Sequence, residues 1–167
     1  SDTEQLTVAG KALTITIGTG NEIFEKNETF YEQPWGILVT DANGNASINQ
    51  TVELSIIPLR FSKGSYDRDD NADPKFTPTI TTTCDTNFAD ANNGIQIANP
   101  ASVPTTVQTD DSGSIQFNVL YPKGECNWVD VRLTATSAVS GFSSSASTDY
   151  RLPCSAEDLN ASAPPGG

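Results

Sequence analysis

Toward its C-terminal end the chain reads Trp128-Val129-Asp130-Val131-Arg132-Leu133-Thr134-Ala135, turns through Ala138 to Gly141, and returns as Ser143 to Leu152. Apolar residues alternate with polar ones in the first arm, which is the period of a strand with one buried face. Neither arm has the period of a helix. The pattern predicts an antiparallel β-hairpin whose turn is centred near residue 140.

The same alternation recurs along the rest of the chain, with turn residues at intervals of roughly ten positions. Turns are predicted at 41–45 and 109–113, where a glycine can adopt the positive φ that such turns need. Repeated short strands with turns between them are typical of an antiparallel β-sandwich or barrel. The other strands expected cover residues 12–17, 35–40, 52–57 and 115–121.

The composition excludes several classes of function. The chain has 167 residues, 21 acidic against 9 basic, and a net charge of -12. The length fits one domain, and the charge argues against binding of nucleic acid or of an anionic membrane surface. No apolar run approaches the roughly 18–20 residues of a membrane span, so we expect no transmembrane segment in this chain.

The chain contains no histidine. Without His, neither Ser-His-Asp nor Cys-His catalysis is possible, and the commonest ligand for zinc and copper is missing. We therefore expect a binding or structural module and not an enzyme. The enzymatic alternative is a pair of carboxylates acting as in a glycosidase, since any two carboxylates can approach each other in space.

Two segments have few strand signals. The stretch at about 62–104 is rich in Asp, Asn, Thr and Pro, and we predict a long irregular insertion there; loops of this length are usually functional or stabilised locally. Residues 155–167 end in Ala-Pro-Pro-Gly-Gly and are predicted to be a C-terminal tail or linker. The expected organisation is a single sandwich over 1–154 followed by that tail.

The three cysteines favour a disulfide over a metal site, because three Cys without His cannot complete a tetrahedral zinc site. A hairpin turn centred near residue 140 places Cys126 opposite Cys154, within the Cα separation of about 5.5 Å that a disulfide tolerates. The alternative is two unpaired buried thiols. Cys84 is then either unpaired or bonded to another chain, and a disulfide would indicate an oxidising compartment.

An acidic stretch within the insertion is a candidate calcium site. Oxygen-bearing side chains stand at alternate positions there, a spacing at which a looped backbone can wrap Ca²⁺. The alternative is a solvated acidic loop that keeps the protein soluble. The calcium ligands predicted are Asp67, Asp69, Asn71 and Asp73, and a looser second set is Asp85, Asn87, Asp90 and Asn92.

Aromatic residues allow a second binding function, because exposed rings stack on sugars. A carbohydrate-binding β-sandwich module is therefore the alternative to a protein-binding one. Trp35 and Trp128 begin predicted strands, which favours a packing role for both. The candidate stacking residues are Trp35, Trp128, Tyr31, Tyr66 and Phe76.

Two parts of the chain resemble bacterial Ig-like domains of the invasin and intimin type. The first is Pro34-Trp35-Gly36-Ile37-Leu38-Val39-Thr40-Asp41-Ala42-Asn43-Gly44-Asn45, followed by Gln50-Thr51-Val52-Glu53-Leu54-Ser55-Ile56. The second is Thr109-Asp110-Asp111-Ser112-Gly113 with Ile115-Gln116-Phe117, then the stretch 128–135. The likeness covers about residues 30–60 and 105–152.

The resemblance implies an Ig-like sandwich of a bacterial surface protein, lipoprotein or pilus-assembly protein. Such a module would lie outside the cytoplasm, in the periplasm, at the outer-membrane surface or secreted. It would act by adhesion or structural contact with a protein partner or with neighbouring domains, and the resemblance supplies no catalytic residue. We expect the insertion to form the partner surface, with Tyr66, Phe76, Cys84 and Phe88 as its residues.

Overall fold

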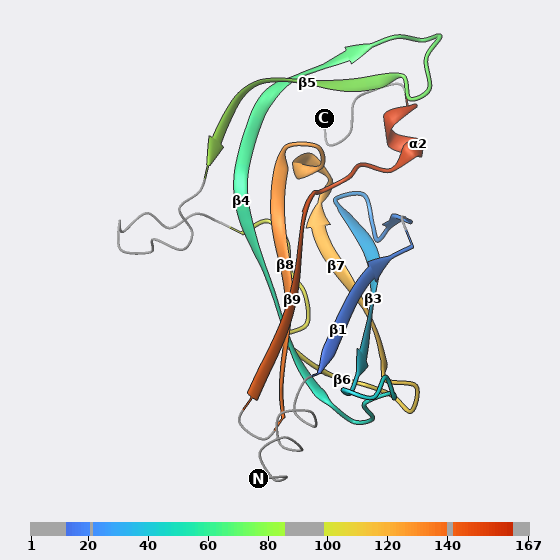
Figure 1. Cartoon of the computed structure of the whole chain (residues 1–167). Coiled ribbons are helices and arrows are strands. Elements are labelled where there is room, and N and C mark those ends of the chain that lie inside the picture. Colours follow the sequence, from blue (N-terminus) through green and yellow to red (C-terminus); the bar gives the residue numbers. More distant parts are fainter. Residues whose placement is uncertain (1–12, 21, 86–98, 140–141, 162–167) are drawn as a thin grey trace, which may run out of the picture.

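The structure is a computed structural model, and it describes residues 13–20, 22–85, 99–139 and 142–161. Within these residues the fold is all-β, with two antiparallel sheets packed together (Figure 1). The predicted all-β antiparallel architecture is therefore confirmed. The strands are β1 (Thr14–Thr19), β2 (Phe24–Glu25), β3 (Phe30–Thr40), β4 (Thr51–Arg68), β5 (Phe76–Asp85), β6 (Thr106–Gln108), β7 (Ser114–Pro122), β8 (Val129–Val139) and β9 (Phe142–Arg151).

The first sheet is built around β3. β7 pairs along one edge of β3, with Phe117 opposite Trp35. β1 and β2 share the other edge, β1 beside residues 35–40 of β3 and β2 beside residues 31–32. Burial alternates along β3 because successive strand side chains point to opposite faces of a sheet.

The second sheet is built around β4, which is 18 residues long. β8 pairs along one edge of β4, and β9 pairs with β8. β6 and β5 share the other edge, β6 beside residues 51–53 and β5 beside residues 60–68. The far end of β4 and the whole of β5 curve over one end of the sandwich (Figure 1).

The core lies between the sheets and consists of alternate residues of β3, β4, β7 and β8. Tyr31, Val39, Val119, Val131 and Leu133 are completely buried. The segment 99–105 crosses from one sheet to the other: Ser102 forms a bridge with Leu120 of β7, and Thr105 accepts a hydrogen bond from the backbone N–H of Leu54.

Both predicted turns are present. Gly44 has a φ of 82° and Gly113 a φ of 74°, values that residues with a Cβ rarely adopt. In each turn the glycine N–H donates to an aspartate carbonyl, that of Asp41 or Asp110. The carboxylate of Asp110 also accepts two backbone N–H groups of its own turn, from Ser114 and Ser112, which lowers its pKa.

The C-terminal hairpin has a register one residue away from the prediction. Val139 pairs with Phe142, so the connection is residues 140–141, which lie outside the described ranges. A connection of two residues puts the centre of the hairpin between positions 140 and 141 and not on position 140. Asp130 therefore faces Arg151, and Arg132 faces Asp149.

The segment predicted as a tail begins with ordered structure. The helix α2 (Ala156–Leu159) is capped by the Ser155 hydroxyl, which accepts a hydrogen bond from the N–H of Asp158. Asp158 in turn accepts a hydrogen bond from the Tyr31 hydroxyl, and Leu159 packs on the core. Within the described part of the chain, no helix has the length and apolarity that crossing a membrane requires.

Candidate partner surface

The upper part of β4, residues 60–68, and β5 form a hairpin that we call the arm (Figure 1). The prediction of an irregular insertion at 62–104 is wrong for residues 62–68 and 76–85, because both stretches are regular strand. The reason lies in the run Thr77 to Thr83, where β-branched threonines favour strand although their hydroxyls suggest a loop. Residues 86–98 lie outside the described ranges.

The two strands of the arm approach each other closely at Gly64. A Cβ on Gly64 would lie 1.8 Å from the carbonyl oxygen of Thr79. The pairing shifts register between Lys63 and Gly64, which leaves Thr81 as an extra residue on β5. A glycine at position 64 is thus what lets β5 lie against β4 at this irregularity.

Tyr66 attaches the arm to the sandwich. Its ring lies between Phe76, at a centroid distance of 6.2 Å, and Trp128, at 5.2 Å. Its hydroxyl donates to the carbonyl oxygen of Cys126 (3.3 Å) and lies 3.5 Å from the Sγ of Cys154. Burial raises the pKa of Tyr66, so its hydroxyl remains a donor at neutral pH.

A disulfide joins Cys126 and Cys154, the predicted pair, and their Cα atoms lie 5.0 Å apart. Cys126 follows the 3-10 helix η2 (Lys123–Glu125) and so lies outside the paired residues of the hairpin. The N–H of Asn127 donates to the carbonyl oxygen of Leu152 (2.7 Å). This hydrogen bond extends the contact between the two strands of the C-terminal hairpin from the paired residues toward the disulfide. Tyr66 therefore packs on a covalently closed end of the fold.

The tip of the arm is held by the residue that follows α2. Asn160 accepts a hydrogen bond from the backbone N–H of Lys75 (2.9 Å), and its amide donates to the carboxylate of Asp73 (3.0 Å). Together with Tyr66, this contact fixes the arm at its middle and at its tip.

The predicted calcium ligands at the tip are not brought together. Asp67 belongs to β4 and accepts a hydrogen bond from the Thr79 hydroxyl, because the strand continues through this position to Arg68. The Asp69 carboxylate accepts a hydrogen bond from the backbone N–H of Asn71 (3.0 Å), and the Asp73 carboxylate accepts one from the Asn160 amide. Among the described residues no group of three or more His, Cys, Asp or Glu is placed to hold a metal ion. Most of the second predicted set, Asn87, Asp90 and Asn92, lies outside the described ranges.

The outer edge of β5 pairs with no strand in the part of the chain that the structure describes. β5 is the terminal strand of its sheet. From Phe76 to Cys84 the strand carries no charged side chain, although the chain as a whole has a net charge of -12. Its exposed residues are Thr77, Thr79, Thr81, Thr82, Thr83 and Cys84.

The predicted partner-surface residues divide between the two sides of the arm. Cys84 is exposed and free of disulfide bonding. Phe76 is 4% exposed and Tyr66 is half-buried, so both form the inner contact of the arm and not a partner surface. The physical reason is that a two-stranded arm needs an apolar inner face to remain attached. Phe88 lies outside the described ranges.

The tryptophans do not form a sugar-stacking surface. Trp35 is 7% exposed and packs against Tyr150, with ring centroids 4.9 Å apart. Trp128 is partly buried, with the ring of Tyr66 edge-on against it at a centroid distance of 5.2 Å. Tyr31 is completely buried. The carbohydrate-binding alternative therefore lacks an exposed ring at the positions that suggested it.

The outer face of the second sheet carries a cluster of paired charges. Asp130 accepts hydrogen bonds from Arg60 and Arg151, both at 2.8 Å. Burial alone would raise the pKa of Asp130, but the hydrogen bonds and charges of Arg151 and Arg60 outweigh it and lower the pKa. Arg132 and Asp149 form a second, exposed pair at 2.8 Å, which raises the pKa of Arg132 and lowers that of Asp149.

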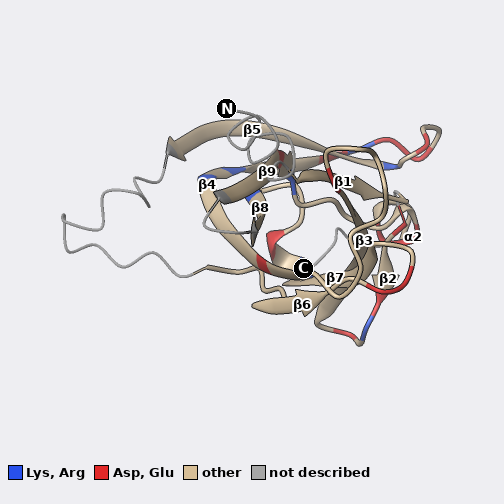
Figure 2. Cartoon of the chain, turned by 60° about the horizontal axis from the view of Figure 1, so that its bottom comes forward, with Lys and Arg blue, Asp and Glu red and all other residues tan. Residues whose placement is uncertain are grey.

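The charged residues are unevenly distributed over the described part of the molecule. Basic residues gather on β4, β8 and β9, whereas acidic residues gather at the end near β2, α2 and the arm tip (Figure 2).

Compared with known protein families and with curated proteins, the chain matches none. Its function must therefore be inferred from its own residues. Cys84 is exposed and its role at a partner surface stays a prediction. The sequence analysis missed the neighbouring threonines, whose β-branched run was the signal for a strand.

Proposed function

We propose that this chain is a non-enzymatic, extracytoplasmic Ig-like module of a bacterial surface or pilus-associated protein, and that it acts through protein–protein contacts. The observation that carries the proposal is the outer edge of β5, which pairs with no strand of the described residues, has no charged side chain from Phe76 to Cys84, and is held in place through Tyr66 and Asn160. An unpaired edge presents N–H and C=O groups with which a strand of another chain can pair.

The order of the strands supports the Ig-like assignment. On this proposal β1, β3 and β7 correspond to strands A, B and E of an Ig-like sandwich, and β4, β8 and β9 to strands C, F and G, because the two sheets pair in the orders β1-β3-β7 and β4-β8-β9. β6 pairs with β4 instead of extending the first sheet. The long β4 and the arm are then an elaboration of strand C and the connection that follows it.

The disulfide supports a location outside the cytoplasm. Disulfides persist in oxidising compartments and are rare where glutathione and thioredoxin keep thiols reduced. Cys126 and Cys154 close the end of the sandwich on which the arm rests. A covalent closure at this point keeps the β5 edge in position when the module is pulled by its partner.

A site-specific cross-linking experiment tests the proposal. The thiol of Cys84, which is exposed on β5, is labelled with a benzophenone maleimide and irradiated in an envelope extract of the source cells. The matched control carries the label at Ser145→Cys in a Cys84→Ala background, because Ser145 is exposed on another edge strand, β9, of the same sheet. We expect a discrete protein adduct from the label on β5 and none from the label on β9.

A second pair of variants separates edge pairing from chance proximity. Lysine on an edge strand opposes pairing with another strand. The double variant Thr77→Lys/Thr83→Lys should therefore remove the adduct, whereas Ser145→Lys/Ser147→Lys should retain it. No adduct from Cys84, or an adduct that survives the lysines on β5, contradicts the proposal.

A further inference from the structure

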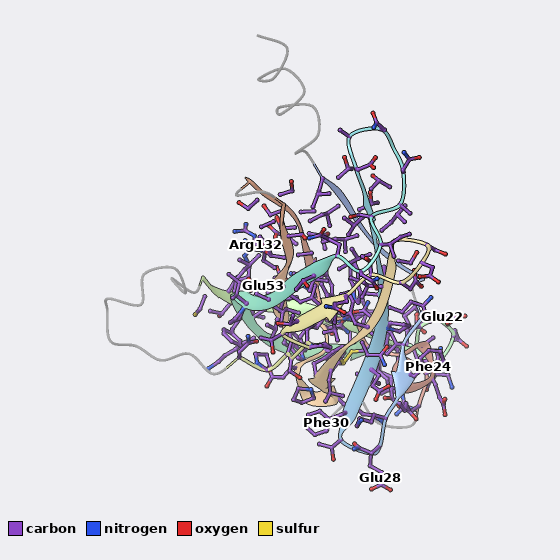
Figure 3. All side chains as sticks on the ribbon, turned by 90° about the horizontal axis from the view of Figure 1, so that it is seen from below. Glu22, Phe24, Glu28, Phe30, Glu53 and Arg132 are labelled. Carbon is purple, nitrogen blue, oxygen red and sulfur yellow. A yellow bond between two sulfur atoms is a disulfide. The ribbon has the colours of Figure 1, made fainter. Side chains whose placement is uncertain are left out.

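A depression lies at one end of the sandwich, away from the outer edge of β5. It opens between the segment around β2 and the residues that follow the disulfide, and its volume is about 530 Å³. In Figure 3 Glu22 and Phe24 lie next to each other on this side of the molecule. The lining residues are Glu22, Ile23, Phe24, Gln33, Pro153, Cys154, Ser155 and Ala156.

The inner wall of this depression contains an unsatisfied acceptor. Gln33 lies on β3, the central strand of its sheet, and is 4% exposed. Its Oε1 is buried and has no hydrogen-bond partner. Buried polar atoms almost always have a partner, and a buried acceptor without one costs free energy that a donor in the depression would recover. A ligand of this site therefore brings an N–H or O–H group to Gln33.

The outer walls are apolar. Ile23, Pro153 and Ala156 contribute hydrocarbon surface, and the ring of Phe24 is 54% exposed. Cys154 is tied to Cys126 by the disulfide, and the carbonyl oxygen of Pro153 accepts a hydrogen bond from the Tyr121 hydroxyl of β7, so this wall is held to the sandwich. The ligand group consequently has an apolar stem as well as a donor at its end.

The charge of the site selects the kind of donor. Glu22 is exposed at the depression, and no basic side chain of the described residues lines it. The lysines of this end are already paired, Lys26 with Glu32 (3.0 Å) and Lys123 with Glu25 (2.9 Å). Acidic residues outnumber basic ones on the segments around β2 and α2 (Figure 2). A donor that carries positive charge is favoured here over a neutral one.

We propose that this depression binds a basic side chain, lysine or arginine, of a protein partner. The aliphatic stem lies along Ile23, Phe24 and Pro153, as long basic side chains do on apolar surfaces. The cationic head donates to the Oε1 of Gln33 and is balanced by the carboxylate of Glu22. This is a site distinct from the β5 edge, and it stands whether or not that edge pairs with a partner strand.

The probes that test this proposal are N-acetyl-lysinamide and N-acetyl-argininamide, titrated into the ¹⁵N-labelled chain and followed by NMR. N-acetyl-norleucinamide, which has a similar stem without the charge, is the matched control probe. We expect the basic probes to shift the side-chain amide of Gln33 and the backbone amides of 22–24 and 154–156, and the norleucine probe to bind at least tenfold more weakly. Equal binding of all three probes, or no shifts at these residues, overturns the proposal; the second result is expected if Gln33 only binds an internal water.

Two pairs of variants assign the contacts. Glu22→Gln should weaken the lysine probe about threefold to fivefold, the range for a single exposed charge, whereas Glu53→Gln on β4 should have no effect. Figure 3 shows that Glu53 lies far from Glu22 and Phe24. Gln33→Leu should abolish binding, and Gln116→Leu on the exposed face of β7 should not. Because Glu22 is exposed, Glu22→Gln folds normally, and unchanged binding by that variant alone refutes the role of the charge.

Discussion

Tyr66 of the arm lies edge-on against Trp128, with their ring centroids 5.2 Å apart and the ring planes at 68°. Tyr66 belongs to β4, and Trp128 directly precedes β8, the strand that pairs with the other edge of β4. Their contact converts a protruding two-stranded hairpin, which is marginal on its own, into a fixed part of the fold. The position of the β5 edge therefore depends on this pair.

Replacing Tyr66 by alanine should release the arm from the sandwich. We expect a loss of about 2 kcal/mol in the free energy of unfolding, less than for a fully buried aromatic because Tyr66 is half-buried. Hydrogen exchange should accelerate in β5 more than in β7, since only β5 loses its support. Tyr66→Phe, which keeps the ring and removes the hydroxyl, should lose only about 1 kcal/mol. Equal exchange rates in β5 of both variants and wild type would show that the arm is held elsewhere.

Gly64→Ala should separate the two strands of the arm. The added Cβ would meet the Thr79 carbonyl oxygen, 1.8 Å away, and backbone atoms cannot yield as a flexible side chain can. We expect a loss of about 2 kcal/mol or more, measured by urea unfolding. Gly18→Ala is the control, because nothing lies within 4 Å of a Cβ at Gly18 and alanine there should be neutral or slightly stabilising. Equal stability of the two variants would contradict the close approach.

The sequence predicted the class of fold because burial follows the alternation of apolar residues. In β3 and β7 each inward position is apolar apart from Gln33, so the period of two was visible without a structure. The arm was not predicted, because its inner face has few large apolar side chains, chiefly Tyr66 and Phe76, and the exposed face of β5 is mostly threonine. The burial of Tyr66 and Phe76 depends on Trp128 and on the disulfide, which are far away in the sequence.

The charged residues of the last hairpin predict its register more accurately than the position of its turn does. Placing the turn on residue 140 sets Val131, which points inward, opposite Asp149, which points outward. Shifting by one residue pairs Asp130 with Arg151 and Arg132 with Asp149, as the structure has them. Opposite charges favour such cross-strand positions, so charge matching predicts the correct register. The candidate basic-side-chain site had no comparable signal, because Glu22, Gln33 and Pro153 meet only in the folded chain.

Removing the disulfide should lower stability without changing the fold. The bridge spans 28 positions, and closing a loop of that length in the unfolded chain is worth about 3 kcal/mol. We expect Cys126→Ala/Cys154→Ala to lose about that amount in urea unfolding and to show faster hydrogen exchange in the arm. Cys84→Ala, which removes an exposed free thiol, should have the same free energy of unfolding as wild type. If the double variant is as stable as Cys84→Ala, the disulfide does not support the arm.

The ion pairs of Asp130 should make stability depend on pH in the acid range. Its pKa lies below the ordinary 3.8 because the hydrogen bonds and charges of Arg151 and Arg60 outweigh its burial, so the folded state binds this proton less readily than the unfolded chain does. The contribution is therefore complete above the unfolded pKa and disappears as the pH falls through the lower folded value. Asp130→Asn should cost about 1.5 kcal/mol at pH 7, and its difference from wild type should shrink as the pH falls below 3.8 and through the folded pKa, as measured by urea unfolding at a series of pH values. Asp149→Asn, which breaks only the exposed pair with Arg132, should cost less than about 0.5 kcal/mol. An Asp130→Asn deficit that does not change with pH in the acid range would show that packing and not charge is responsible.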